Sequence, residues 1–144
     1  MAQKNNYIYK VEPQDVDYTH RVRLSKLGRA ILNAAGIDAQ KNGIGIDTLN
    51  KDRYTWVLSR MAIELDSMLG QYAPYIVSTW VNEYNRALST RNFILSSEDK
   101  MFGRAITQWC LFDLDERSLV DLNKLDVHDA LLVDEPSPMS KPCR

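Results

Sequence analysis

A single helical segment followed by a run of β-type segments is the feature that most constrains how this sequence can fold. Apolar residues recur at helical spacing between Leu24 and Ala35, as they do on the buried face of an amphipathic helix. This spacing predicts a helix over residues 26–35, with Ser25 as its N-cap and Gly36 as the left-handed residue just past its end. Small residues on several of its sides predict that other backbone packs closely around it.

Residues 38–51 are polar and turn-rich, whereas residues 7–11 and 54–113 have the composition of β-strands. Strands are predicted at residues 7–11, 54–66, 75–84, 89–95 and 101–112. Residues 97–100 form a short loop, so the last two strands are expected to make an antiparallel hairpin. The other connections after residue 54 are also short, which favours antiparallel neighbours because parallel pairs need long crossovers.

One helix covers only one face of such a sheet, so the economical arrangement is a curved antiparallel sheet wrapped around one long buried helix. The sequence therefore predicts an α+β fold of the hotdog type over residues 1–122. The outer face of the sheet needs a second cover, and self-association or a second hotdog domain is expected to supply it. Residues 119–133 have an amphipathic, helix-like pattern, and three prolines follow. Residues 123–144 are therefore predicted to form a linker-like tail that leads toward a second hotdog domain.

Composition excludes several classes of protein. The 144 residues, 44% of them apolar, fit one globular domain with a sizeable core. No apolar run exceeds four residues, and the first residues do not resemble a secretory signal. Cys110 and Cys143 lie far apart without zinc-type spacing, as in proteins of a reducing compartment. We therefore expect a cytoplasmic protein that does not act at a membrane.

Charge is distributed unevenly along the chain. Residues 1–60 contain ten Lys or Arg against six Asp or Glu, although the net charge of the whole chain is −1. This excess is too small to indicate nucleic-acid binding. Four basic residues cluster around the start of the predicted helix, and they form either a solvated edge or a docking site for an acidic protein partner. They are Arg21, Arg23, Lys26 and Arg29.

Few residues have a pattern typical of catalysis. Asp17 and His20 precede the helix, where they either act as a general base on water or belong to an ordinary solvated loop. Cys110 lies within a predicted strand with no histidine near it in the sequence. We interpret it as a buried, inert thiol.

Seven short strings of residues occur in a distinctive order and spacing. They are Val16–Ser25, Leu27–Gly28, Asn33–Gly36, Trp56–Glu64, Thr79–Trp80, Thr90–Leu95 and Gly103–Trp109. Together they resemble the acyl-acyl carrier protein thioesterase family of plant plastids and bacteria. The resemblance covers about Tyr7 to Leu122, and the lack of a transit peptide before Lys4 favours a bacterial relative.

The resemblance implies two hotdog domains in tandem that hydrolyse fatty acyl-acyl carrier protein to a free fatty acid in fatty acid biosynthesis, with no metal or organic cofactor. It also implies that the first domain shapes the acyl pocket and that the second carries an Asp-x-Asn-x-His string. This chain aligns with the first domain, and its nearest string, residues 121–125, lacks the histidine. No catalytic residue is assigned, and the isolated chain is expected to be inactive. The implied partner is an acyl carrier protein that bears a fatty acyl-phosphopantetheine group.

Six residues are candidates for contact with the acyl chain: Leu27, Ile31, Met61, Ile63, Trp80 and Trp109. The strand pattern leaves the inward face open, because Trp80 alternates with Val77, Thr79 and Val81 and only one set can face inward. Two other functions remain open. One is a single-hotdog acyl-CoA thioesterase that forms a homodimer and uses Asp17 as its base. The other is a non-catalytic acyl-binding module.

Overall fold

The computed structural model describes residues 4–42, 44–45, 49–122 and 132–139. The five predicted strands are present as β1 to β5, and a short sixth strand follows them. In chain order the elements are β1 (Asn5–Lys10), the 3-10 helix η1 (Pro13–Asp15), α1 (Leu24–Lys41), the 3-10 helix η2 (Asn50–Asp52), β2 (Tyr54–Leu65), β3 (Pro74–Tyr84), β4 (Ser89–Ser97), β5 (Lys100–Asp113) and β6 (Ser118–Leu119).

Helix α1 is longer than predicted, because it continues through Gly36 to Lys41. Ser25 is therefore not the N-cap and Gly36 is not the residue past the C-terminus. Arg23 and Asn42 occupy the capping positions, and Arg23 makes no side-chain capping hydrogen bond. Gly36 stays helical because packing of the turns on both sides outweighs the cost of a mid-helix glycine, about 1 kcal/mol.

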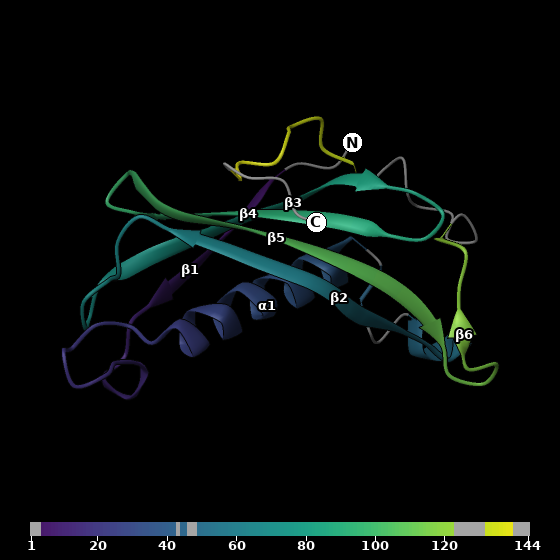
Figure 1. Ribbon diagram of the computed structural model, residues 1–144, viewed down its shortest axis with the longest axis horizontal. Coiled ribbons are helices and arrows are strands. Elements are labelled where there is room, and N and C mark those ends of the chain that lie inside the picture. The colour runs from purple at the N-terminus through teal and green to yellow at the C-terminus, as the bar shows by residue number, and fades with distance from the viewer. Residues whose placement is uncertain (1–3, 43, 46–48, 123–131, 140–144) are drawn as a thin grey trace.

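All paired strands are antiparallel, in the order β1-β3-β4-β5-β2, and β6 pairs with β5 (Figure 1). The predicted hairpin is present, with Ser97 opposite Lys100. The expectation that a short loop joins neighbouring strands is wrong for β2 and β3, which β4 and β5 separate. Residues 66–73 cross between them beside the start of α1, where Arg21 pairs with Gly70.

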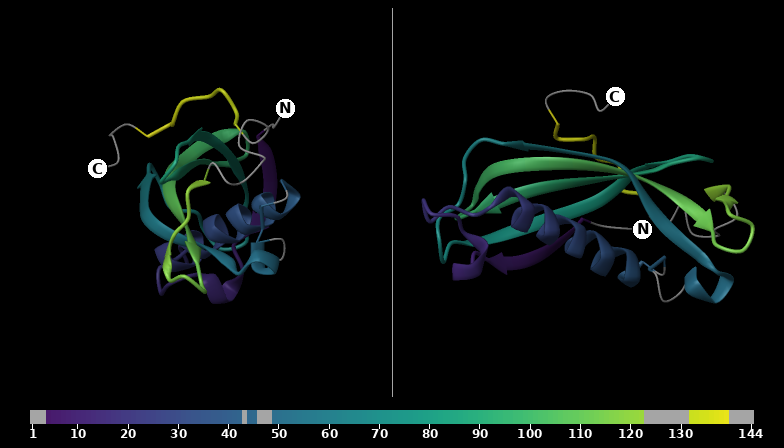
Figure 2. Two further views of the ribbon diagram at one scale, coloured as in Figure 1. Left: turned by 90° about the vertical axis from the view of Figure 1, so that its right-hand side faces the viewer. Right: turned by 60° about the horizontal axis from the view of Figure 1, so that its bottom comes forward.

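The sheet curls around α1, so the helix lies within its concave side (Figure 2). Register shifts in the β2–β5, β3–β4 and β4–β5 pairs add the local bending that such a curl needs. Gly103 allows β5 to approach β2 closely, since a Cβ there would lie 2.6 Å from Leu65 Cδ2 and 3.0 Å from the Glu64 carbonyl oxygen. These features confirm the predicted α+β arrangement of one curved antiparallel sheet around one long helix.

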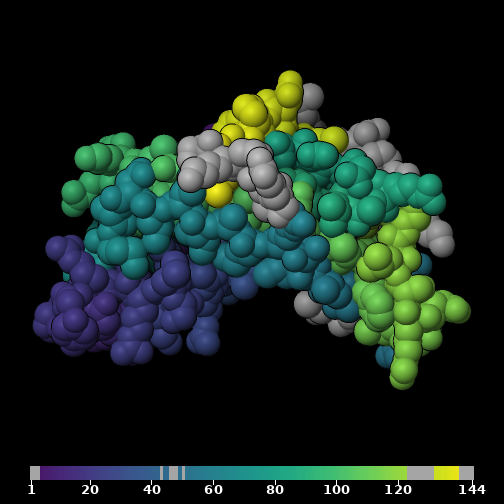
Figure 3. Space-filling model, viewed as in Figure 1, coloured from purple at the N-terminus to yellow at the C-terminus, as the bar shows by residue number. Residues whose placement is uncertain are grey.

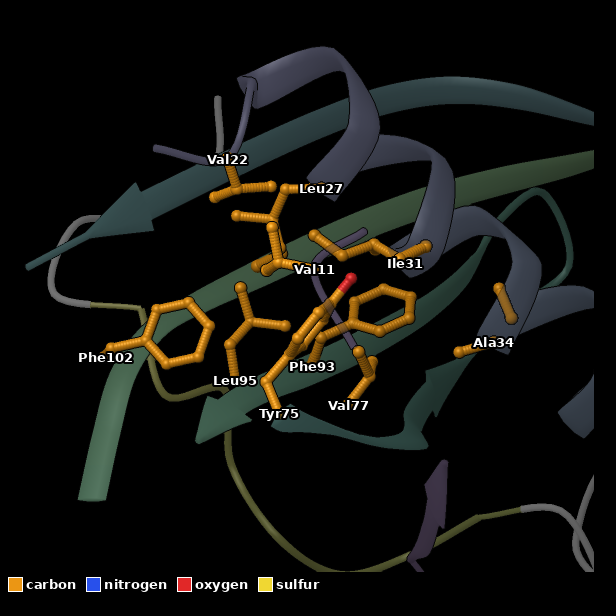
Figure 4. Close-up of a cluster of buried hydrophobic side chains, with 13 residues drawn as sticks. Val11, Val22, Leu27, Ile31, Ala34, Tyr75, Val77, Phe93, Leu95 and Phe102 are labelled. Carbon is orange, nitrogen blue, oxygen red and sulfur yellow. The ribbon is translucent and has the colours of Figure 1, made fainter. Parts of the chain in front are cut away.

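The main hydrophobic core lies between the first half of α1 and the sheet (Figure 4). Leu27 and Ile31 project from the helix toward Phe93 and Leu95, and all four side chains have no exposed surface. Leu24, which belonged to the predicted apolar stripe, is 54% exposed. It lies in the first turn of the helix, outside this core.

A second cluster of buried residues lies toward the other end of the molecule. It consists of Leu49, Leu111, Val120 and Leu122, with Tyr54, Trp56 and Tyr84 packed against it. Residues 123–131 lie outside the described part of the chain, so the predicted amphipathic helix over 119–133 is described only at its ends, and there residues 118–119 form strand β6. No helix among the described residues has the length and hydropathy needed to cross a membrane.

The outer face of the sheet is partly covered by the chain itself. Leu132 forms a parallel bridge with Val81, and the Trp80 indole N–H donates a 2.9 Å hydrogen bond to the Glu135 carbonyl. Lys4 forms an ion pair with Glu135, and its ammonium group lies over the Trp80 ring. Figure 3 shows segment 132–139 lying across the top of the molecule. The predicted cover by a second domain or a second copy remains a prediction.

Candidate functional site

A cavity of about 340 Å³ lies between the second half of α1 and the concave face of the sheet. Its volume falls at the lower end of the range for small-molecule sites. The helix, strands β2, β4 and β5, and the segment after the helix all contribute to its wall. The lining residues are Leu32, Ala35, Gly36, Ala39, Gln40, Ile44, Gly45, Trp56, Ser89, Arg91 and Trp109.

Two tryptophans form apolar walls of this cavity. Trp109 packs against the main core and Trp56 against the second cluster, so the cavity lies between the two. The Trp56 indole N–H donates to the Ile44 carbonyl over 2.9 Å, and the Trp109 indole N–H donates to Thr107 Oγ1 over 2.8 Å. Because both polar N–H groups have partners, the rings can present carbon surface to a ligand.

Small residues on the second half of α1 leave the space that the cavity occupies. Ala35, Gly36 and Ala39 line it, and a Cβ added at Gly36 would meet no atom within 4 Å. Gly45 closes the end of the cavity by lying against the last turn of the helix, where a Cβ would come 2.8 Å from Gln40 Cα. A glycine is therefore required at position 45, whereas position 36 has room for a larger side chain.

One buried ion pair borders the cavity. Arg91 Nη1 lies 2.5 Å from Asp38 Oδ2, and the two side chains are 5% and 2% exposed. The other carboxylate oxygen of Asp38 accepts hydrogen bonds from Asn5 Nδ2 at 2.7 Å and Tyr7 Oη at 2.8 Å. Burial first, and then this hydrogen bond to Asp38, raises the pKa of Tyr7, so its phenol stays protonated at physiological pH. The pair is thus held by neutral donors in an apolar setting, where a charge without a partner would be costly.

The six candidate acyl contacts fall into four groups, and Trp80 is the last of them. Leu27 and Ile31 are fully buried in the main core and do not line the cavity. Met61 and Ile63 face the concave side and pack against the same core. Trp109 lines the cavity.

Trp80 lies on the other face of the sheet, under residues 132–135, because Tyr75 and Val77 are the β3 residues that face the helix. Sequence reasoning missed most of the cavity residues, above all Gly36 and Arg91. The small residues around residue 36 could have indicated a cavity beside the helix. The predicted helix ended at residue 35, so its second half, which lines the cavity, was not considered.

The residues considered for catalysis lie at the other end of the helix. Asp17 precedes α1. The cavity begins at Leu32, which lies about 12 Å along the helix axis from the first residue of α1, Leu24. The Asp17 carboxylate accepts hydrogen bonds from the Thr19 hydroxyl and from the amides of Thr19 and Arg21. Chiefly because of the Thr19 hydroxyl, its pKa lies below the ordinary value, which makes the carboxylate a weak base.

Cys110 lies in β5 as predicted, but it is half-buried rather than buried. Among the described residues, no group of three or more His, Cys, Asp or Glu side chains is arranged to hold a metal ion.

The predicted basic cluster lies at the start of α1. Arg21, Arg23 and Arg29 are exposed, and Lys26 is half-buried. The Arg21 guanidinium makes a 3.4 Å hydrogen bond to the Met68 carbonyl. None of the four forms an ion pair with a described residue. Their charge is therefore available to a partner.

A curved antiparallel sheet wrapped around a single long helix, with an apolar cavity between them, defines a hotdog-fold protein. The sequence matches the family model described as "Acyl-ACP thioesterase N-terminal domain" over residues 3–129. The chain belongs to this family, which confirms the resemblance seen in the sequence. A comparison with curated proteins gives no match.

Solved structures agree with this assignment. The chain is 42% identical to an acyl-ACP thioesterase from Bacteroides thetaiotaomicron, with a TM-score of 0.89 over 98% of this chain. It spans 58% of the length of that protein. The 12:0-ACP thioesterase from Umbellularia californica is 13% identical with a TM-score of 0.84, and the match covers 98% of this chain and 59% of that one.

A 1,4-dihydroxy-2-naphthoyl-CoA thioesterase from Synechocystis, Slr0204, is 14% identical with a TM-score of 0.78, over 93% of this chain and 100% of that one. At these low identities the last two structures support the hotdog fold alone.

Proposed function

We propose that this chain forms the acyl-binding part of a cytoplasmic thioesterase that acts on fatty acyl-acyl carrier protein in fatty acid biosynthesis. The cavity between α1 and the sheet is the observation that carries the proposal, because its two tryptophans and small helix residues suit an unbranched apolar chain. Family membership supports the reaction class, and the basic cluster at the start of α1 suits an acidic carrier protein.

In this reaction, the oxygen of a water molecule bonds to the thioester carbonyl carbon and the carbon–sulfur bond breaks. The products are a free fatty acid and the thiol of the carrier's phosphopantetheine group. The step needs a base for the water and hydrogen-bond donors for the developing oxyanion. We assign neither role to a residue of this chain. We expect no appreciable hydrolysis by the 144 residues alone and recovery of hydrolysis when a second hotdog domain is joined to them.

A single-hotdog enzyme that uses Asp17 as base is less well supported. The depressed pKa of Asp17, its hydrogen bonds and its position before α1 all argue against that role. In an assay of thiol release from a medium-chain acyl thioester, robust turnover by the 144 residues that is lost in Asp17→Asn would support that enzyme instead. Stoichiometric binding without thiol release, unaffected by a second domain, would support a non-catalytic module.

Substitutions at Gly36 test the acyl-binding role directly. Gly36→Leu should fill part of the cavity and weaken binding of dodecanoic acid by about tenfold or more, as measured by isothermal titration calorimetry. Gly36→Ala is the matched control, because its single methyl leaves most of the cavity open and favours the helix. Equal affinity of the two variants for dodecanoic acid would contradict this use of the cavity.

A further inference from the structure

The wall of the cavity contains one buried charged group whose hydrogen-bonding capacity is only partly used. Arg91 is 4% exposed, and its Nη1 donates to Asp38 Oδ2 and, over 3.2 Å, to Thr79 Oγ1. A guanidinium carries five N–H donors on three nitrogens. The Nε and Nη2 groups of Arg91 donate no hydrogen bond to the described part of the chain. A ligand that covers these donors without offering an acceptor would leave them buried and without partners, which is unfavourable.

The charge state of this wall indicates what kind of acceptor suits it. Asp38 neutralises Arg91, and its carboxylate is held in place by Asn5 and Tyr7. A second carboxylate would approach a pair whose net charge is zero, whereas a neutral oxygen needs only the remaining N–H donors. Ser89 lies two residues from Arg91 on the same face of β4 and also lines the cavity, so its hydroxyl adds a second polar contact.

We propose that the cavity prefers an acyl chain that carries a hydroxyl or oxo group along its length, with Arg91 donating a hydrogen bond to that oxygen. The inference rests on the proposed acyl-binding function and specifies its substrate class. An unsubstituted chain would cover the guanidinium with CH₂ groups and leave its donors without partners. An oxygenated chain of the same length keeps the apolar contacts with Trp56 and Trp109 and satisfies these donors.

Binding of matched acids to the unaltered 144-residue chain tests this preference. Dodecanoic acid and its series of monohydroxy isomers are titrated by isothermal titration calorimetry. We expect at least one isomer to bind about tenfold more tightly than dodecanoic acid, as a hydrogen bond from a charged donor allows. If dodecanoic acid binds and no isomer binds more tightly, the inference is overturned while the proposed function stands. If none of the acids binds, both are overturned.

A double substitution tests whether Arg91 is the source of the preference. Arg91→Met/Asp38→Asn removes both charges yet keeps an acceptor for Asn5 and Tyr7, and it should make the preferred isomer and dodecanoic acid bind equally. The matched control is Arg104→Met/Asp66→Asn, which removes a 2.8 Å ion pair that does not border the cavity. The control should keep the tenfold preference, and circular dichroism should show that both variants are folded. A preference that persists in the folded Arg91 variant would overturn the role given to Arg91.

Discussion

At the scale of single residues, the buried pair of Arg91 and Asp38 shows how the fold gives two ordinary charged side chains a role in the interior. The two residues are 53 apart in the sequence, and neither is distinctive there. In the folded chain they meet beside the cavity, one on β4 and the other on α1. Each charge is tolerated in the interior because the other compensates it.

Removal of one member of this pair should therefore be more harmful than removal of both charges. We expect Arg91→Met to lower the free energy of unfolding by about 3–5 kcal/mol, because it leaves the Asp38 carboxylate buried without its counter-charge. Arg91→Met/Asp38→Asn should recover a large part of that loss. Urea unfolding of the two variants measures both values. A double variant that is less stable than the single one would contradict this account of the pair.

At the scale of elements, helix α1 has a different task in each half. Its first half supplies Leu27 and Ile31 to the main core, and its second half supplies small residues to the cavity. A helix that packs tightly along its whole length would leave no room for a ligand. The change from large to small side chains along the helix thus separates the residues that form the main core from those that line the cavity.

Two isoleucines on this helix allow a matched test of its packing. Ile31 is fully buried and Ile37 is 41% exposed. We expect Ile31→Ala to lower the free energy of unfolding by about 2–5 kcal/mol, the range for large-to-small changes in a packed core. Ile37→Ala should change it by less than about 0.5 kcal/mol, as surface substitutions do. Urea unfolding measures both values. If the two variants lost similar free energies of unfolding, the orientation of α1 in the structure would be contradicted.

At the scale of the whole molecule, the basic cluster and the cavity lie toward opposite ends of α1. The basic cluster is at its start, whereas the cavity lies beside its second half. If a carrier protein docks at the basic cluster, the acyl chain must pass along the helix to reach the cavity. This arrangement predicts that docking and chain selection can be altered independently.

Charge reversal in the basic cluster tests the docking role. Arg21→Glu/Arg23→Glu should weaken binding of an acyl carrier protein at low ionic strength, with a smaller difference at high salt, where exposed charges are screened. Lys51→Glu/Arg117→Glu makes the same change in net charge at exposed positions away from the start of α1, and it should have little effect. Surface plasmon resonance at two salt concentrations measures both variants. Equal affinity at low salt would restore the interpretation of a solvated edge.

Stability at alkaline pH should reflect two tyrosines, the buried Tyr75 and the half-buried Tyr84. Burial raises the pKa of Tyr75 and of Tyr84 to about 12, from the ordinary value of 10.0. Above pH 10 the unfolded chain loses these protons while the folded chain keeps them, so the unfolded state is favoured and stability falls between pH 10 and about 12. Tyr84→Phe should reduce the slope of this fall in urea unfolding, whereas Tyr18→Phe, at a residue that is 94% exposed, serves as the control. An unchanged slope in Tyr84→Phe would contradict the burial effect.

Local patterns in the sequence determined much of the fold. Alternation and β-branched content located the five long strands, and helical spacing located α1, because both signals arise from residues close together in the chain. The loop expected at residues 97–100 predicted the β4–β5 hairpin for the same reason, and in the structure Ser97 and Lys100 pair across the turn. The strings of residues that run from Val16 to Trp109 also carried the family resemblance.

Only the tertiary structure decided which strands pair across the sheet, which face of β3 turns inward and where the cavity lies. Strands β4 and β5 lie between β2 and β3, so the sheet order depends on pairings between residues far apart in the sequence. Trp80 lies outside and Tyr75 inside because the register of β3 is set by its contacts with β1, β4 and α1, and either face was compatible with the alternation alone. Gly36 continues the helix instead of ending it, since packing from distant strands outweighs a local preference of about 1 kcal/mol. The cavity depends on all of these long-range contacts, so no local pattern could have shown it.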